Sequence, residues 1–331
     1  MFNHSRLTAP SWLLAMLLWA PLALGEWVVE ERELMGTAVA VELWSDDPDT
    51  GRRLAAEALA EIRRLDLMMN PWNPDSELAR INREAAAGPV ETTPEIIEVL
   101  ERALHYSALS EGAFDVSFAS VGQHYDYRAG KQPEAEQIAA GRAGIDYRAI
   151  DLDPSTASVH FRKAGMQLDF GGIAKGYAVD RAVAILQAGG ISSAVVSAGG
   201  DSRILGLHGE RVRTIGIRHP RKAGEFAAIV PLANMAISTS GDYERFFIAD
   251  GVRHHHILNP GTGESAREVQ SASVLAPAAV DSDALSTTVF VLGVEKGLAL
   301  VNSIAGIDAI IIDGAGKLHY SADLLRETQA P

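Results

Sequence analysis

The sequence contains no cysteine among its 331 residues. This absence excludes disulfide bonds, thiol catalysis and thiolate metal sites, and it also excludes a lipid anchor on an N-terminal cysteine. The burial of apolar side chains must therefore stabilise the fold. The chain is 47% hydrophobic and 22% charged, and it is long enough to bury a large core.

The sequence also has few basic residues relative to acidic ones. The chain has 29 Lys and Arg against 43 Asp and Glu, which gives a formal net charge of −14. Such a surface repels phosphate backbones, so we expect no nucleic acid partner. A smaller phosphate-bearing ligand remains compatible with this charge if a local cation or a metal offsets the field.

Long apolar runs are missing except at the N-terminus, where residues 11–25 read SWLLAMLLWAPLALG. Arg6 is the only charge before this run, and the run ends in small residues, so the pattern predicts a signal peptide over residues 1–25. A retained membrane anchor is the alternative. With no later run of about 18 apolar residues, we expect residues 26–331 to be periplasmic, either soluble or held at the inner membrane by the N-terminus.

The patterns along residues 26–331 predict an α+β fold with antiparallel or mixed sheets flanked by helices. We expect one domain, with two closely packed subdomains as the alternative. Residues 122–145 are polar and weakly patterned, as an insertion or a mobile loop would be. The clearest local predictions are hairpins over 26–44 and 307–324, helices over 50–69 and 94–109, and a short strand over 166–170.

Residues 169–183, DFGGIAKGYAVDRAV, place two glycines before a predicted helix. Glycine lets other groups approach the backbone closely, and the start of a helix presents free N–H groups to an anion. Lys175 would add a positive charge there. The stretch lacks the order of a P-loop or of a dinucleotide-binding fingerprint. An ordinary tight turn with a solvated lysine is the alternative.

The stretch DSDALSTT at residues 281–288 places Asp283 and Thr287 four residues apart, on one face of a predicted helix. A carboxylate and a hydroxyl are hard oxygen ligands, which suit Mg²⁺. The alternative is that Asp281 or Asp283 only caps the helix.

Three consecutive histidines, at 254–256, suggest zinc, but alternate side chains of a strand point to opposite faces. We therefore expect one inward histidine, His256, and surface roles for the other two. Two glycine-containing turns, AGGDSR at 198–203 and STSGDYER at 238–245, have the composition of ligand-clasping loops or of plain turns. In GAFD, at 112–115, Phe114 could meet a flat ring and Asp115 a hydroxyl or an amide; a buried turn is the alternative.

Taken in order, these motifs resemble the ApbE family, the FAD:protein FMN transferases. The likeness covers nearly all of residues 30–322. Its motifs are MGT, NPWNPDSELARIN, GAFD, DFGGIAKGYAVDR, AGGD, STSGDYER, HILNPGTG and DALSTTVFVLG.

The resemblance implies an exported, Mg²⁺-dependent enzyme that cleaves FAD and attaches FMN to a threonine or serine of a target flavoprotein, releasing AMP. Such targets are often subunits of membrane electron-transfer complexes. By similarity, Asp283, Thr287 and the backbone carbonyl of Gly172 would bind the metal, and His256 is the candidate base. The residues expected to hold FAD are Met35, Trp72, Ala113, Phe114, Asp115, Asp169, Lys175, His256, Ile257 and Leu258.

The sequence departs from the family pattern at three positions and leaves other activities open. Asn259 stands where the family has Asp, Trp72 where Tyr is common, and Phe170 where Leu is usual. The alternatives are an FAD pyrophosphatase of the same fold, a non-catalytic periplasmic flavin carrier, and an oxidoreductase. The oxidoreductase is disfavoured because the sequence has no Rossmann fingerprint.

Overall fold

The computed structural model describes residues 25–329, so the predicted signal peptide lies outside the described residues except for Gly25. The helical elements are α1 (Pro48–Met69), α2 (Glu77–Glu84), α3 (Pro94–Leu109), η1 (Val116–Phe118), α4 (Ala119–Gly122), α5 (Ala135–Arg142), η2 (Tyr147–Ala149), α6 (Ala174–Ala188), α7 (Ala279–Asn302) and α8 (Ala322–Gln329). The strands are β1 (Glu26–Leu34), β2 (Thr37–Ser45), β3 (Val90–Glu91), β4 (Ile150–Asp153), β5 (Ser158–Phe161), β6 (Ala194–Ala198), β7 (Asp201–Leu205), β8 (Arg213–Arg218), β9 (Phe226–Leu232), β10 (Ala236–Gly241), β11 (Phe246–Ala249), β12 (Val252–His255), β13 (Leu258–Asn259), β14 (Glu264–Ser265), β15 (Val269–Ala276), β16 (Asp308–Asp313) and β17 (Leu318–Tyr320).

An eight-stranded sheet forms the centre of the fold, in the order β1-β2-β6-β7-β10-β15-β16-β17. Every pairing in it is antiparallel. The strands stand in the sheet in the order in which they occur in the chain, and helices are inserted between neighbours. The predicted α+β fold is confirmed, with antiparallel rather than mixed pairing in this sheet.

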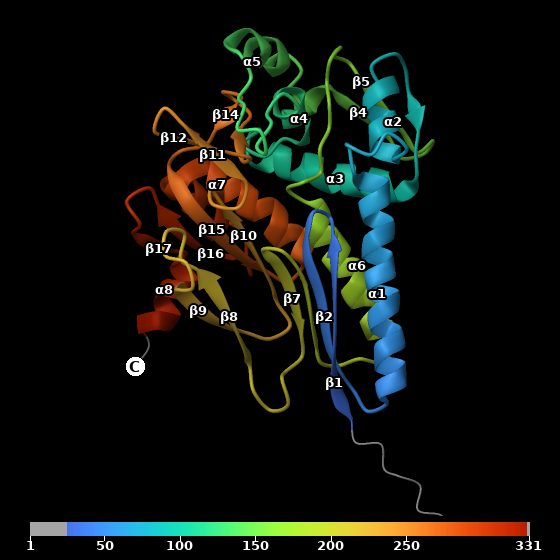
Figure 1. Cartoon of the computed structure of the whole chain (residues 1–331), viewed down its shortest axis with the longest axis vertical. Coiled ribbons are helices and arrows are strands. Elements are labelled where there is room, and N and C mark those ends of the chain that lie inside the picture. Colours follow the sequence, from blue (N-terminus) through green and yellow to red (C-terminus); the bar gives the residue numbers. More distant parts are fainter. Residues whose placement is uncertain (1–24, 330–331) are drawn as a thin grey trace, which may run out of the picture.

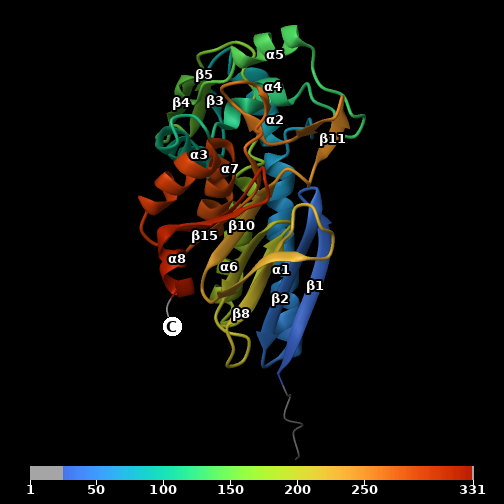
Figure 2. The same cartoon turned by 90° about the vertical axis from the view of Figure 1, so that its left-hand side faces the viewer.

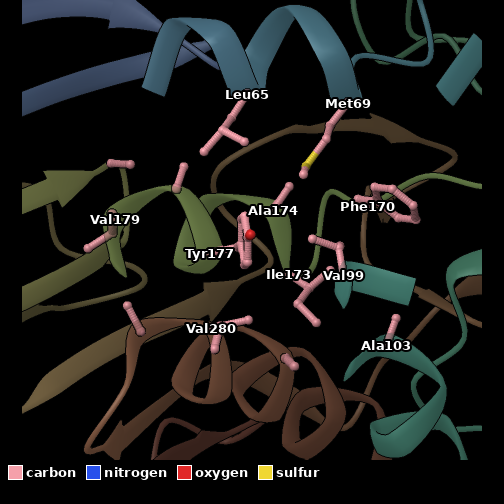
Figure 3. Close-up of a cluster of buried hydrophobic side chains, with 14 of the residues drawn as sticks. Leu65, Met69, Val99, Ala103, Phe170, Ile173, Ala174, Tyr177, Val179 and Val280 are labelled. Carbon is pink, nitrogen blue, oxygen red and sulfur yellow. The ribbon is translucent and has the colours of Figure 1, made fainter. Parts of the chain in front are cut away.

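Helices α1, α6 and α7 pack side by side on one face of the sheet (Figures 1 and 2). Figure 3 shows the core where they meet: Leu65 of α1, Tyr177 of α6 and Val280 of α7 point toward one another, and Val99 of α3 joins them. α7 has the length and the mean hydropathy, 1.6, of a membrane span, but half of that stretch is buried inside the protein. Its contacts with α6, β10 and β15 make it a core helix.

The other face of the sheet carries the two-stranded β8–β9 ribbon, whose Ile217 and Val230 pack on Ile204 and Ile237 of the sheet. Helices α2 to α5 and the small sheet β3-β5-β4 gather at one end of the molecule, beyond the tip of the β1–β2 hairpin (Figure 1). The single domain over residues 26–331 stays a prediction.

Most of the local predictions are confirmed. Residues 26–44 form the β1–β2 hairpin, which turns at Met35 and Gly36 with φ of 52° and 70°. Helices α1 and α3 lie where the apolar spacing placed them, and β16 and β17 form the final hairpin.

The predicted strand over 166–170 is wrong. Leu168 donates its N–H to Asn82 Oδ1 at 2.8 Å, and its carbonyl accepts from Asn82 Nδ2 at 2.9 Å. A buried side-chain amide thus satisfies the extended backbone in place of a neighbouring strand. Residues 122–145 contain α5, which buries none of its residues, and Tyr125, which is buried. Most of the stretch is exposed, so the insertion or mobile loop stays a prediction.

Candidate active site

The site begins where helices α6 and α7 cross at Gly176. A Cβ atom at this position would lie 2.2 Å from the Ala279 carbonyl oxygen, so only glycine allows so close a crossing. The N–H of Gly176 donates to Asp283 Oδ2 at 2.9 Å. Asp180 of α6 accepts from the N–H groups of Ala279 and Val280, each at 2.9 Å, and so caps α7. The crossing therefore fixes Asp283 in one position.

Lys175 lies between two buried carboxylates. Its Nζ is 2.5 Å from Asp201 Oδ2 and 3.5 Å from Asp283 Oδ1. Burial, followed by the neighbouring Asp201, raises the pKa of Asp283 to about 7. The two carboxylates outweigh burial on the lysine and raise its pKa above the ordinary value. Together these groups form a charge cluster in which two buried carboxyl groups flank a half-buried lysine.

Hydroxyl groups line the neighbouring turn of α7. Ser240 Oγ on β10 is 2.9 Å from Ser286 Oγ and 3.2 Å from Thr287 Oγ1. A Cβ atom at Gly172 would lie 3.2 Å from Thr287 Oγ1 and 3.1 Å from Phe114 Cε2. The glycine loop, the aromatic of GAFD and the α7 hydroxyl therefore meet at one point.

A second cation lies at the edge of this site. Arg245 Nη2 is 3.5 Å from the Gly36 carbonyl oxygen, in the turn that follows Met35. Asp169 accepts from the Gly171 N–H at 2.7 Å. Burial raises the pKa of Asp169, and the charges of Arg245 and Lys175 oppose that rise. Arg245 thus connects the β1–β2 turn with the glycine loop.

His256 is the histidine that faces this region. Its Nδ1 is buried and has no hydrogen-bond partner within residues 25–329. Burial, then the charge of Arg245, lowers its pKa to about 3, so the ring is neutral near pH 7. The predicted surface role of His255 is wrong: it is 3% exposed and its Nε2 is 2.6 Å from the Ala266 carbonyl oxygen, because β12 pairs its backbone with Ser265.

The GAFD turn holds its acid inward. Asp115 Oδ1 accepts from the N–H and the hydroxyl of Ser117, at 2.8 and 2.6 Å, and Oδ2 accepts from the Tyr147 N–H at 2.9 Å. Burial raises its pKa. The preceding Ala113 is half-buried and donates its N–H to the Ser110 carbonyl. Asp115 therefore fixes the shape of the turn that presents Phe114.

Three further predicted residues lie outside the close contacts around Asp283. Ile257 and Leu258 are both 5% exposed and pack into separate apolar clusters. The Ile257 N–H donates to His255 Nδ1 and its carbonyl accepts from the Ala266 N–H, so their role in holding FAD stays a prediction. Trp72 is 68% exposed on the loop after α1. Within residues 25–329, none of the contacts joining Gly172, Asp283 and Thr287 includes it.

Sequence reasoning missed several residues of this site. Asp201 was visible as the acid of AGGD, and Ser240 and Arg245 as parts of STSGDYER, but no spacing rule paired them with Lys175, Thr287 or Gly36. The packing of α6 against β7 brings Asp201 to Lys175, and the packing of α7 against β10 brings Ser240 to Thr287; both are long-range contacts. Within residues 25–329, no three His, Asp or Glu side chains form a metal-binding group.

The arrangement defines a class of site: a glycine-lined loop, a half-buried lysine and hard oxygen donors, suited to a ligand rich in phosphate. The ApbE family model matches residues 35–311. The chain belongs to the ApbE family.

Curated relatives and solved structures agree with this assignment. The FAD:protein FMN transferase of Treponema pallidum (strain Nichols) is 35% identical over 315 residues, 88% of this chain and 86% of the relative. That of Klebsiella pneumoniae (strain 342) is 31% identical over 84% and 87%. The ApbE protein of Thermotoga maritima superposes with a TM-score of 0.84 at 31% identity, covering 91% of this chain and 99% of its own. The flavin transferase ApbE of Vibrio cholerae gives 0.82 at 26%, with the same coverage.

Proposed function

We propose that this chain is an FAD:protein FMN transferase that uses Mg²⁺. Support comes from family membership, from relatives of that name at about one-third identity over most of the chain, and from the convergence of Gly172, Asp283 and Thr287 beside Lys175. This convergence is the observation that carries the proposal, because it joins two motifs far apart in the sequence, DFGGIAKGYAVDR and DALSTTVFVLG.

The donor set fits magnesium. Asp283 supplies a carboxylate that is 2% exposed, and Thr287 supplies a hydroxyl facing the glycine loop. All donors are oxygen atoms, and few are charged, which suits an ion that keeps waters and substrate phosphates as ligands. Asp283, Thr287 and the carbonyl of Gly172 would hold the ion. When bound, it would neutralise charge on the FAD diphosphate.

The residues of the chain then have separate tasks. The glycine loop and Lys175 bind the diphosphate, and Met35, half-buried in the β1–β2 turn, would contact the flat ring. Phe114 is 3% exposed and packs against Gly172, so it supports the glycine loop. Asp201 holds Lys175 in place at 2.5 Å. In the transfer, the target hydroxyl oxygen bonds to the FMN phosphorus and the bond to the AMP oxygen breaks. His256, with its unpartnered Nδ1, is the predicted base. Its pKa of about 3 makes it a weak proton acceptor near pH 7, so this role stays a prediction.

Two further parts of the proposal rest on the sequence. The apolar run at 11–25 supports export to the periplasm. The acceptor would be a threonine- or serine-bearing flavoprotein, such as a subunit of a membrane electron-transfer complex, and this partner class comes from the family resemblance.

Intact-mass measurement tests the function. Residues 26–331 are incubated with FAD and MgCl₂, together with a threonine-bearing flavoprotein domain or its Thr→Ala variant. We expect the first domain alone to gain the mass of FMN less water, with one AMP released per transfer and no reaction in EDTA. AMP release without a gain in mass on any acceptor would indicate the pyrophosphatase instead. No cleavage of FAD would indicate a flavin carrier.

A further inference from the structure

The β11–β12 hairpin stands apart from the main sheet, directly before His256. It forms a two-stranded sheet of its own within residues 25–329, and its tip turns at Asp250 and Gly251 with φ of 49° and 74°. Figure 2 shows β11 projecting beside the end of the β1–β2 hairpin. The His256 N–H donates to the Arg245 carbonyl at 3.1 Å and closes the base of the hairpin. One end of the hairpin is therefore joined to the candidate site.

One face of this hairpin is anchored. Phe247 stacks on His254 with ring centroids 5.1 Å apart, and Tyr127 lies 6.1 Å from Phe247. Tyr127 stacks in turn on Tyr125 at 5.5 Å. This aromatic row ties the hairpin to the segment before α5 and holds it rigidly relative to the site.

The opposite face is open. Phe246 and Ile248 are 37% and 62% exposed, and they alternate with the anchored Phe247. Arg253, directly opposite Ile248 in the register, lies over the Phe246 ring at 3.8 Å. Exposed aliphatic and aromatic side chains beside an arginine have the composition of a binding hot spot.

The edge of β11 is open as well. β12 lies against β14, where Ser265 Oγ accepts from the His255 N–H at 2.9 Å. β11 pairs with β12 alone among the described strands. An unpaired strand edge beside apolar side chains is what an extended peptide requires for strand addition.

We propose that the outer edge and open face of β11, with Phe246, Ile248 and Arg253, bind an extended segment of the acceptor protein and guide its hydroxyl toward His256. The inference rests on the proposed transferase function. The continuity of β11 with Arg245, and of β12 with His256, argues for this occupant: a segment paired along β11 runs directly into the site.

Two matched variants test the surface. Ile248→Asp changes the open face of β11, and Ile229→Asp changes an equally exposed isoleucine, 64%, on the β8–β9 ribbon. The probe is the purified flavin-binding domain of a membrane electron-transfer subunit that carries an acceptor threonine. We expect Ile248→Asp to raise the KM for this domain by about tenfold or more, with FAD affinity unchanged. Ile229→Asp should leave both values at those of the wild type.

Hydrogen exchange gives a second measurement without substitution. Amides of residues 246–249 should become protected when the acceptor domain binds, and those of the β8–β9 ribbon should not. An unchanged KM in Ile248→Asp, an equal rise in both variants, or no protection of β11 would overturn the inference. If the wild-type protein transfers no FMN to the domain while cleaving FAD, the proposed function fails instead, and protection of β11 still reports on docking.

Discussion

Helices α1 and α7 are both long and pack on the same face of the sheet, yet they bury different chemistry. The buried side of α1 is apolar and includes Leu54, Ala58, Ile62, Leu65 and Met69. The first turns of α7 bury polar side chains: Ser282, Asp283, Ser286 and Thr288. α1 stabilises the fold, and α7 presents oxygen atoms.

The polar groups of α7 are tolerated because each has a partner. Ser282 is 2.8 Å from Ser238, Thr288 donates to the Ala284 carbonyl at 2.7 Å, and Asp283 accepts from Gly176. A buried polar group without a partner costs about 1–3 kcal/mol. The comparison teaches that β10 and α6 supply the polar partners that the first turns of α7 need. Substitutions here should therefore change activity, and substitutions in α1 should change stability.

Removal of the Asp283 carboxylate should have the largest effect. We expect Asp283→Ala to lower Mg²⁺-dependent FAD cleavage by about 10³-fold, the loss typical when a preorganised charge-stabilising group is removed. The fold should remain, because the substitution removes two opposing effects at once. The repulsion between the Asp201 and Asp283 carboxylates is lost together with the hydrogen bond from the Gly176 N–H to Asp283. AMP release and the thermal midpoint measure the two properties.

Asp281→Ala provides the control on the same helix. Asp281 accepts from the Tyr106 hydroxyl at 2.7 Å, whereas Asp283 contacts Lys175 and Gly176, so loss of Asp281 should leave turnover near that of the wild type. Equal activity in Asp283→Ala and Asp281→Ala would remove Asp283 from the proposed metal site.

The reverse result is expected for α1. Ile62 is fully buried, so Ile62→Ala should lower the free energy of unfolding by about 2–5 kcal/mol. Below the unfolding transition, kcat per folded molecule should not change. Urea unfolding and turnover at low temperature measure both. A large loss of kcat in a folded Ile62→Ala protein would contradict the separation between the two helices.

The same difference explains how far sequence reasoning reached. The apolar period of residues 50–69 predicted α1, and the i, i+4 spacing of Asp283 and Thr287 predicted the oxygen face of α7. The spacing could not show that Asp201 would pair with Lys175, because that contact depends on the β6–β7 hairpin lying next to α6. It also missed the role of Asn82, because a side chain that replaces a strand partner leaves no periodic signal.

Lowering the pH should reduce the stability of the fold through His256. Burial and Arg245 hold its pKa at about 3, below the ordinary 6.5, so between these values the unfolded chain binds more protons than the folded one. Stability from this group is complete above pH 6.5 and is lost as the pH falls toward 3. We expect His256→Gln to flatten the stability curve by up to about 1.4 kcal/mol per pH unit. Urea unfolding at pH 7, 6 and 5 measures it, and parallel curves would contradict the buried, neutral ring.

The smallest expected effect concerns Ser240, whose hydroxyl contacts the proposed metal ligand Thr287 but does not bind the metal itself. Ser240 Oγ lies 3.2 Å from Thr287 Oγ1 and orients it, whereas the adjacent Thr239 bonds to Ser273 at 2.8 Å. Loss of such a supporting partner weakens metal affinity by about 10–100-fold. We expect Ser240→Ala to require about tenfold more Mg²⁺ for half-maximal FAD cleavage and to regain full turnover at saturation. Thr239→Ala should keep the wild-type requirement. A Mg²⁺ titration of both variants measures the requirement. The same shift in both would mean that the loss of any β10 hydroxyl loosens the packing of α7. The hydroxyls between β10 and α7 would then stabilise the fold, as the apolar face of α1 does, rather than orient a metal ligand.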